Sequence, residues 1–238
     1  MLLGGGLLAG CGVSSDDDQP SSSATASVTP SPTPSDSPTP TVTVTATPSP
    51  TPSPTAPASP SLTPEEALLT ASELPPINEA VRWKQGRTGP VSSAAFGLCA
   101  KFDVLSVGAE QAVERRFTAT QGAKATAGQQ VVTFPDAATT ARATKVLQSW
   151  QRTCAGRVPG TAVKVQPIAS VPVAQGTGWW YLVSYVRGGE GHFHAFGVDV
   201  VGTRISLVAM DITGADHDYP PGQDPVQLAV KAAAKKLG

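Results

Sequence analysis

The chain has 238 residues, a formal net charge of -1 at pH 7 and only 15% charged residues. Such a chain has no basic surface to neutralise phosphates, so we exclude nucleic acid as a partner. Beyond the N-terminus no apolar run approaches the roughly 20 residues that a membrane-spanning helix needs. Any attachment to a membrane therefore has to come from the N-terminal residues.

Residues 1–11 are typical of the signal peptide of an exported lipoprotein. An apolar, glycine-rich stretch ends in Leu8-Ala9-Gly10-Cys11, which resembles the lipobox of bacterial lipoproteins. We expect Cys11 to carry the lipid, palmitate included, and to anchor the chain to the extracytoplasmic face of the cell membrane. The alternative is a free thiol in an unstructured leader. A signal peptide normally opens with Lys or Arg, so we also expect translation to start upstream of Met1.

Residues 12–61 read as a disordered stalk rich in Ser, Thr and Pro. Proline fixes its own φ and biases the residue before it toward extended conformations, so the segment is expected to sample polyproline II. At about 3.1 Å per residue, such a stalk reaches on the order of 150 Å when fully extended. The density of Ser and Thr is compatible with O-glycosylation.

Residues 62–238 carry the apolar periodicity of one globular domain. In chain order we predict a short helix over 64–73, strands over 113–118 and 129–134, a long helix from 135 to about 156, a strand over 163–169, strands over 179–186, 192–201 and 204–212, and a helix over 224–237. Thr63 and Glu66 match a capping box at the first helix. Residues 77–100 give no clear assignment. We expect an α+β fold, an antiparallel sheet with two main helices packed on one face and a possible cleft on the other.

The turn at Gly202-Thr203 predicts a two-residue hairpin, which pairs Phe196 with Ala209 and His194 with Asp211. The register between the strands predicted over 179–186 and 192–201 is harder to predict, because the loop between them, 187–191, is longer. If it aligns Val186 with His192, the mostly apolar face that contains Phe196 also receives Trp180, Leu182 and Ser184, and the helices are expected to pack there.

The opposite face then mixes aromatic, small and polar side chains, as ligand grooves do. We predict a ligand-binding groove on it, lined by Trp179, Tyr181, Tyr185, Asp199 and Ser206. Gly197, opposite Tyr181, would leave a hollow beside the ring. The alternative is an ordinary second packing face or an exposed sheet surface.

The chain has three cysteines, and an extracellular location favours disulfides. With Cys11 committed to lipid, Cys99 and Cys154 have only each other as partners, so we predict a disulfide between them. The alternative is two buried free thiols. Neither Cys has another Cys or a His at metal-ligand spacing, so we expect no metal there.

The same register places Ser184, His194 and Asp211 in one row, which superficially resembles a Ser-His-Asp triad. A nucleophilic Ser needs a sharp turn beside an oxyanion hole, and a residue within a flat sheet has neither, so a His-Asp hydrogen bond is the better interpretation. His192 and His194 form an H-x-H pair, which more often packs than binds metal. No phosphate-binding or dinucleotide motif is present, so we predict no cofactor and no enzymatic activity.

Three motifs, LLTASELP at 68–75, VVTFPDA at 131–137, and Trp150 with Cys154, resemble the PknH-like extracellular sensor domain family of actinobacteria. That family occurs at the outer end of transmembrane serine/threonine kinases and in stand-alone lipoproteins. The resemblance spans 62–238 and implies an antiparallel sheet with helices against it and a non-catalytic ligand cleft. The kinase version has two disulfides, a kinase domain and a transmembrane helix; these differences weigh against direct signalling across the membrane.

We therefore expect a lipid-anchored sensor or ligand-binding domain that takes an unknown small molecule, lipid or cell-wall ligand. The first alternative is a cell-envelope interaction protein that binds a protein or a cell-wall polymer. The second alternative is a hydrolase centred on His194.

Overall fold

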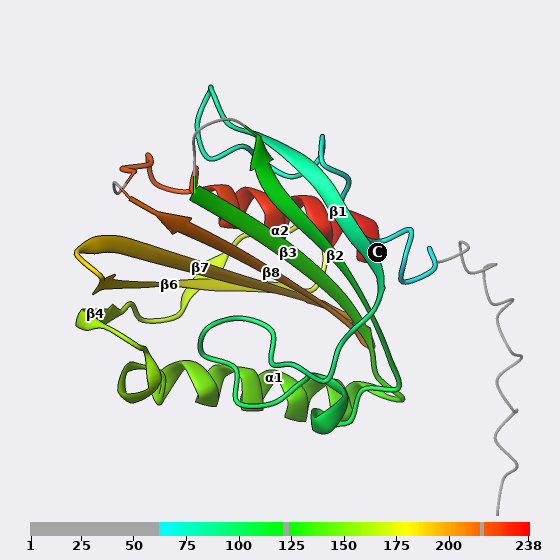
Figure 1. The fold of residues 1–238 in the computed structure, drawn as a ribbon. Coiled ribbons are helices and arrows are strands. Elements are labelled where there is room, and N and C mark those ends of the chain that lie inside the picture. Colours follow the sequence, from blue (N-terminus) through cyan, green and yellow to red (C-terminus); the bar gives the residue numbers. More distant parts are fainter. Residues whose placement is uncertain (1–61, 121–123, 215–216) are drawn as a thin grey trace, which may run out of the picture. The chain divides into compact units, whose positions relative to one another are not determined.

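The computed structural model describes residues 62–120, 124–214 and 217–238. The lipidation predicted at Cys11, the signal peptide at 1–11 and the stalk at 12–61 lie outside these residues. Figure 1 shows the fold of the described part, a twisted sheet with a helix on each side. Within that part no helix has the length and apolar character needed to cross a membrane.

The described strands form one antiparallel sheet of eight (Figure 1). The strands are β1 (Arg82–Pro90), β2 (Gln111–Thr120), β3 (Lys124–Thr133), β4 (Thr161–Val165), β5 (Ala169–Val171), β6 (Thr177–Arg187), β7 (Glu190–Val201) and β8 (Arg204–Thr213). Their order across the sheet is β1-β2-β3-β8-β7-β6-β4, and β5 also pairs with β6. The predicted strands are confirmed except the one over 163–169, which is two strands, β4 and β5, separated at 166–168, and β1 comes from the stretch that had no assignment.

Two α-helices accompany the sheet, α1 (Ala137–Arg152) and α2 (Pro225–Leu237). Each begins after an Asp whose side chain accepts a hydrogen bond from a first-turn backbone N–H, at 2.7 Å for Asp136 and 2.9 Å for Asp224. Helix α1 ends before Cys154, and the short 3-10 helix Ala155–Arg157 follows, so the predicted helix end at Gly156 is four residues late. A second 3-10 helix spans Leu105–Val107.

The helix predicted over 64–73 is wrong, because these residues form hydrogen-bonded turns. The capping box itself is present, with the Thr63 N–H donating to Glu66 Oε2 at 2.8 Å. The backbone N–H of Leu69, however, donates to the Gln129 side chain at 2.6 Å, and the Leu69 carbonyl accepts from Arg115 at 2.9 Å. Contacts with the sheet thus replace the helical hydrogen bonds of this segment.

The two helices pack on opposite faces of the sheet, so the prediction that both share one face is wrong (Figure 1). On one face Leu147 and Trp150 of α1 belong to a core cluster with Phe196 and Leu207. On the other, α2 packs in a separate cluster whose members include Val226, Ala229, Ala233, Val208 and Met210. We call these the α1 face and the α2 face. Both are apolar enough to bury a helix, which sequence alternation alone did not show.

The register of the β7–β8 hairpin is confirmed, since Phe196 pairs with Ala209 and His194 with Asp211. The register predicted for β6–β7 is off by one residue, because Val186 pairs with Gly191. Gly188 and Gly189 have φ of 60° and 80° and form a two-residue turn. The prediction had assumed a longer loop over 187–191. A slip of one residue moves every side chain of β6 to the other face.

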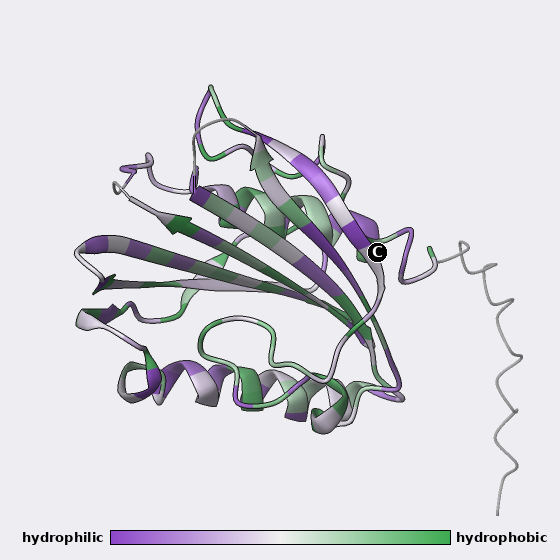
Figure 2. Cartoon of the chain, in the orientation of Figure 1, coloured by the Kyte–Doolittle hydropathy of each residue, from purple (hydrophilic) through white to green (hydrophobic). Residues whose placement is uncertain are grey.

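Strand β1 ends the sheet on one side and is mainly hydrophilic (Figure 2). Most of its residues are exposed, and Trp83 is the one that its burial pattern marks as buried. Its charged side chains, Arg82, Lys84 and Arg87, discourage another strand from pairing with this edge. Pairing of a strand from another molecule with the β1 edge is therefore disfavoured.

Candidate functional site

The structure does not bring the five predicted groove residues together. Trp179 and Tyr181, which are 5% and 3% exposed, lie in the core cluster beneath α1, and Tyr185 shares their face. Asp199 and Ser206 pair with each other across β7 and β8 and lie on the α2 face, where both are fully buried. The prediction that these residues line one groove is wrong, as a direct result of the register shift in β6.

The hollow expected at Gly197 is filled by α2. Gly197 pairs with Trp180 rather than Tyr181. A Cβ atom at Gly197 would lie 2.4 Å from Val230 Cγ2 and 3.1 Å from Val226 Cγ2. The missing side chain therefore lets the helix approach the sheet closely and leaves no room for a ligand.

The triad-like row is also not assembled. Ser184 pairs with Phe193 and faces α2, whereas His194 lies on the α1 face, so the two side chains are on opposite sides of the sheet. The predicted His-Asp hydrogen bond is confirmed, with His194 Nδ1 at 2.7 Å from Asp211 Oδ1. His192 lies 3.1 Å from the Thr213 hydroxyl and stacks on Tyr185. Among the described residues, no three His, Cys, Asp or Glu side chains gather as metal ligands.

The disulfide between Cys99 and Cys154 is confirmed. It joins the segment 91–104, which crosses the α1 face, to the end of α1, and both cysteines are buried. Arg157 reinforces this junction by donating to the Cys99 carbonyl at 2.5 Å. The segment is attached a second time through Leu98, whose backbone N–H donates to His194 Nε2 at 3.1 Å.

Between this segment and the sheet lies a cavity of about 200 Å³, which we call the sheet pocket. Its wall is formed by Ala95, Phe96 and Gly97, and its floor by strands β2, β3 and β8. The floor residues are Arg116, Phe117, Thr118, Thr126, Ala127, Gly128, Ala209 and Asp211. Several of these floor side chains are polar or charged, which sets this cavity apart from an unfilled part of the core.

Two adjacent rows of cross-strand pairs explain why the sheet is hollow here. One row runs Thr118, Thr126, Asp211, His194 and the next runs Arg116, Gly128, Ala209, Phe196. The middle of the second row holds the two smallest side chains, which leaves a depression between the guanidinium and the phenyl ring. The ring of Phe96 enters it from above, since a Cβ at Gly128 would lie 2.9 Å from Phe96 Cε2.

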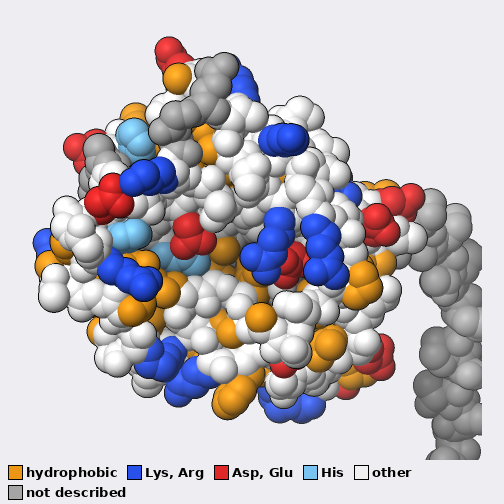
Figure 3. Space-filling model, in the orientation of Figure 1, with side chains coloured by type: hydrophobic (Ala, Val, Ile, Leu, Met, Phe, Trp, Pro, Cys, Tyr) orange, Lys and Arg blue, Asp and Glu red, His pale blue; other side chains and the backbone are white. Residues whose placement is uncertain are grey.

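The floor carries charges of both signs. Arg116 forms an ion pair through Nε with Glu114, which also accepts from the Gln130 amide at 2.6 Å. The side chains of Arg116 and Asp211 are 60% and 56% exposed, so both groups remain accessible to a solute. Figure 3 looks onto this side of the molecule, where basic, acidic and histidine side chains lie near one another among apolar ones.

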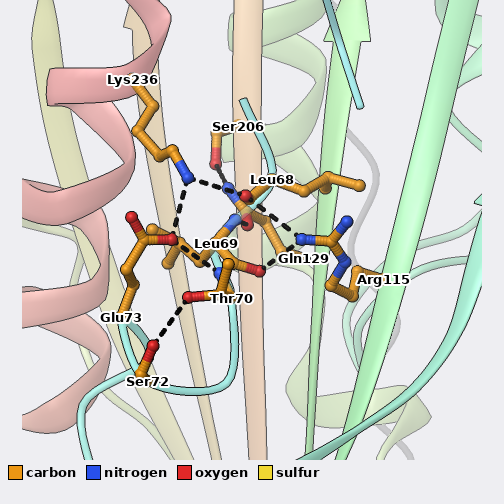
Figure 4. A network of polar contacts seen from close by, with 9 residues as sticks. All are labelled: Leu68, Leu69, Thr70, Ser72, Glu73, Arg115, Gln129, Ser206 and Lys236. Carbon is orange, nitrogen blue, oxygen red and sulfur yellow. Dashed lines mark hydrogen bonds and ion pairs between the residues drawn. The ribbon is translucent and has the colours of Figure 1, made fainter. Parts of the chain in front are cut away.

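A second polar cluster, on the α2 face, has a structural role. Figure 4 shows Arg115 and Lys236 directed at the backbone of Leu68 and Leu69. Lys236 Nζ donates to the Leu68 carbonyl at 3.1 Å and pairs with Glu73 at 2.8 Å, while Arg115 donates to the Leu69 carbonyl at 2.9 Å. An open depression of about 500 Å³ adjoins these residues. Its cations already hold the 63–74 segment against the sheet and have little capacity left for a ligand.

Asp199 is the most perturbed carboxyl group of the described part. It is fully buried, and neither oxygen has a hydrogen bond of standard geometry. Burial raises its pKa well above the ordinary value, and the neighbouring Ser206 hydroxyl opposes that rise. Burial likewise raises the pKa of the Tyr181 phenol. Both groups are enclosed by the core, which explains the shifts without a catalytic role.

Sequence reasoning missed the residues of the sheet pocket. Arg116, Thr118 and Thr126 lie on predicted strands, but their position beside Asp211 depends on the pairing of β3 with β8, which are far apart in the sequence. The wall residue Phe96 belongs to a segment without periodicity. The His194–Asp211 pairing is the one signal in the sequence that indicated this part of the sheet.

No family model matches the sequence, and no curated protein matches it either. Among solved structures, the extracellular domain of PknH from Mycobacterium tuberculosis is similar, with a TM-score of 0.50 and 15% sequence identity. The match covers 74% of this chain and 98% of the other. At that identity the likeness concerns the fold, so residues 62–238 contain a PknH-like extracellular domain fold.

Proposed function

We propose that this chain is an extracytoplasmic ligand-binding or sensor domain, tethered to the membrane by a lipid on Cys11, and that the sheet pocket holds the ligand without catalysis. The extracytoplasmic location is supported by the Cys99–Cys154 disulfide and by the fold shared with an extracellular domain. The ligand is a small molecule or a small portion of a larger envelope component.

The sheet pocket is the observation that carries the proposal. It combines an aromatic wall at Phe96 with accessible groups that can bond to a ligand, namely Arg116, Thr118, Thr126 and Asp211. Its wall segment is held by a covalent bond at Cys99 and a hydrogen bond at Leu98. A site preformed in this way loses little conformational entropy on binding.

The absence of catalysis is proposed from the hydrogen bonds of His194, whose ring lies beside Asp211 and Gly97 of the pocket. His194 donates from Nδ1 to Asp211 and accepts at Nε2 from the Leu98 N–H, so neither nitrogen is available as a base. The Ser184 hydroxyl is on the other side of the sheet. These contacts support a binding site rather than a hydrolase.

Chemical-shift mapping of the isotope-labelled full chain tests the proposal. We would titrate a panel of amino acids, short peptides, sugars and lipid headgroups, and follow the amide signals of Gly97 and Gly128. A binding ligand should shift these signals in the wild type and not in Thr126→Trp, whose new ring fills the pocket from its exposed rim. Gln111→Trp, on an exposed position of β2 outside the pocket, is the matched control. Shifts confined to other parts of the domain would contradict the proposal.

An envelope interaction protein is a second candidate, favoured by two exposed apolar side chains. Phe102 and Leu105 are 61% and 45% exposed, and Phe102 packs edge-on against Trp150 of α1. Such exposed apolar groups are typical of contact sites for other macromolecules. Sedimentation of the full chain with purified cell walls tests this function, because Phe102→Ser should then reduce binding whereas Thr126→Trp should not.

A further inference from the structure

We infer that the sheet pocket is built for a ligand that carries both a carboxylate and an ammonium group, of the size of a short peptide. This inference rests on the proposed function and specifies the class of ligand. It follows from the positions of Arg116 and Asp211 and from the hydrogen-bonding groups of their side chains that no described residue uses.

Arg116 supplies the cationic end of the site. Its Nε is engaged by Glu114, and no other described residue accepts a hydrogen bond from its two terminal nitrogens. Arg87 is exposed and lines an adjoining hollow together with Arg116 and Glu114. A guanidinium with a free edge binds a carboxylate through two parallel hydrogen bonds, so a ligand carboxylate fits here.

Asp211 supplies the anionic end. One of its oxygens accepts from His194 Nδ1, and the other has no hydrogen bond to a described residue. Because His194 Nε2 accepts from the Leu98 N–H, its proton is on Nδ1 and the ring is neutral in this arrangement. The negative charge of Asp211 is therefore not cancelled by its partner, and it can attract an ammonium group.

The distance between the two ends sets the length of the ligand. Arg116 is on β2 and Asp211 on β8, with β3 between them and Asp211 two residues beyond the Arg116 row, so their backbones are about 12 Å apart. Arg116 Nε is paired with Glu114, in the cross-strand row on the side away from Asp211, so the gap between the two charged groups exceeds a single α-amino acid and takes a ligand of at least dipeptide length. Between the charges lie Ala209 and the ring of Phe96, which covers Gly128, so a short apolar side chain of the ligand would lie against the ring and Ala209.

A ligand with one charge would fit less well. A pure anion at Arg116 would also lie near Glu114 and Asp211, and a pure cation at Asp211 would lie near Arg116. A molecule with both groups uses each end, and its ammonium group offsets the repulsion that Asp211 exerts on a pure anion.

The experiment is a calorimetric titration of the full chain, disulfide intact, with three probes. They are alanyl-alanine, its N-acetyl derivative, which lacks the ammonium group, and its amide, which lacks the carboxylate. We expect alanyl-alanine to bind at least about tenfold more tightly than either derivative, since each loses a charge-assisted contact. Arg116→Gln should abolish the preference over the amide, and Asp211→Asn the preference over the N-acetyl derivative.

Two controls separate binding from folding. Asp211→Asn keeps an oxygen that can accept from His194, so its Leu98 amide signal should be unchanged. Arg152→Gln, at an exposed position of α1, should retain both preferences.

The inference is overturned if the three probes bind equally, or if alanyl-alanine fails to bind while another compound of the panel shifts Gly97 and Gly128. In those cases the proposed function still stands. If no compound shifts these signals, the proposed function fails together with the inference.

Discussion

The ring of His194 accepts a hydrogen bond from the backbone N–H of Leu98, 96 residues earlier in the chain, and thereby holds the pocket wall to the centre of the sheet. The same ring is 2% exposed and donates to Asp211 on its other side. A buried neutral histidine thus orients one wall and one floor residue of the sheet pocket.

Replacing His194 with Phe should loosen this wall. The aromatic volume is kept, but the Leu98 N–H loses its acceptor, so we expect a loss of stability of about 1–3 kcal/mol. Amide hydrogen exchange at Leu98 should accelerate more than exchange in β7 itself. His192→Phe, on the same strand and half-buried, is the control. Unchanged protection at Leu98 would contradict the role given to this bond.

Replacing Asp199 with Asn should stabilise the domain at neutral pH. Burial raises the folded-state pKa of Asp199, so the native state retains a proton that the unfolded state loses above about pH 4. Stability is therefore greatest below the unfolded-state pKa and declines as pH rises toward the folded-state pKa. Asparagine avoids this cost, and we expect a gain of about 1 kcal/mol or more at pH 7.

The gain should disappear near pH 4, and urea unfolding of both proteins across this pH range measures it. Asp218→Asn, on an exposed residue, is the control. A gain that is equal at pH 4 and pH 7 would show that Asp199 does not hold a proton in the folded state.

Removing the disulfide should cost about 4 kcal/mol in the chain-entropy estimate, because the bond closes a loop between residues separated by 55 positions. The paired substitutions Cys99→Ser and Cys154→Ser would be compared with the oxidised wild type by urea unfolding. The wild type measured under reducing conditions should match the variant. A difference of less than about 1 kcal/mol would mean that other contacts, such as Arg157 to the Cys99 carbonyl, suffice to hold the segment.

Gly197→Ala should destabilise the contact between the sheet and α2 by about 1–3 kcal/mol, since the new Cβ would overlap the Val230 side chain. Val230→Ala in the same chain should recover part of the loss, and thermal unfolding of the single and double variants measures this coupling. Gly156→Ala is a matched control, because a Cβ there meets nothing within 4 Å. Additive effects at positions 197 and 230 would argue against the steric explanation.

The sequence was most informative where a local rule decides the structure. Asp136 and Asp224 mark helix starts by capping, and Gly202-Thr203 determines the β7–β8 register. It failed at Gly188-Gly189, where the turn is equally short but the flanking residues resemble a longer loop. That single error placed Ser184 beside His194 and assigned Trp179 and Asp199 to one face.

The sheet pocket could not be predicted for a different reason. Arg116 and Asp211 line one pocket because β3 pairs with β8, and no turn or periodicity connects these strands. The position of Phe96 depends on the disulfide and on the Leu98 hydrogen bond, both of which are tertiary contacts. Pairing between distant segments is where local patterns carry the least information.

The pairing of β3 with β8 also bears on how the chain folds. Strands β3 and β8 lie in the centre of the sheet, so β3 gains its second partner, and the β1-β2-β3 part joins the rest of the sheet, only when the last strand has been made. Contacts of such high sequence separation slow folding, because a long loop must close before they form. A nascent chain that stops at residue 203, before β8, should therefore remain unfolded, and the domain should acquire its structure as a single late event in synthesis.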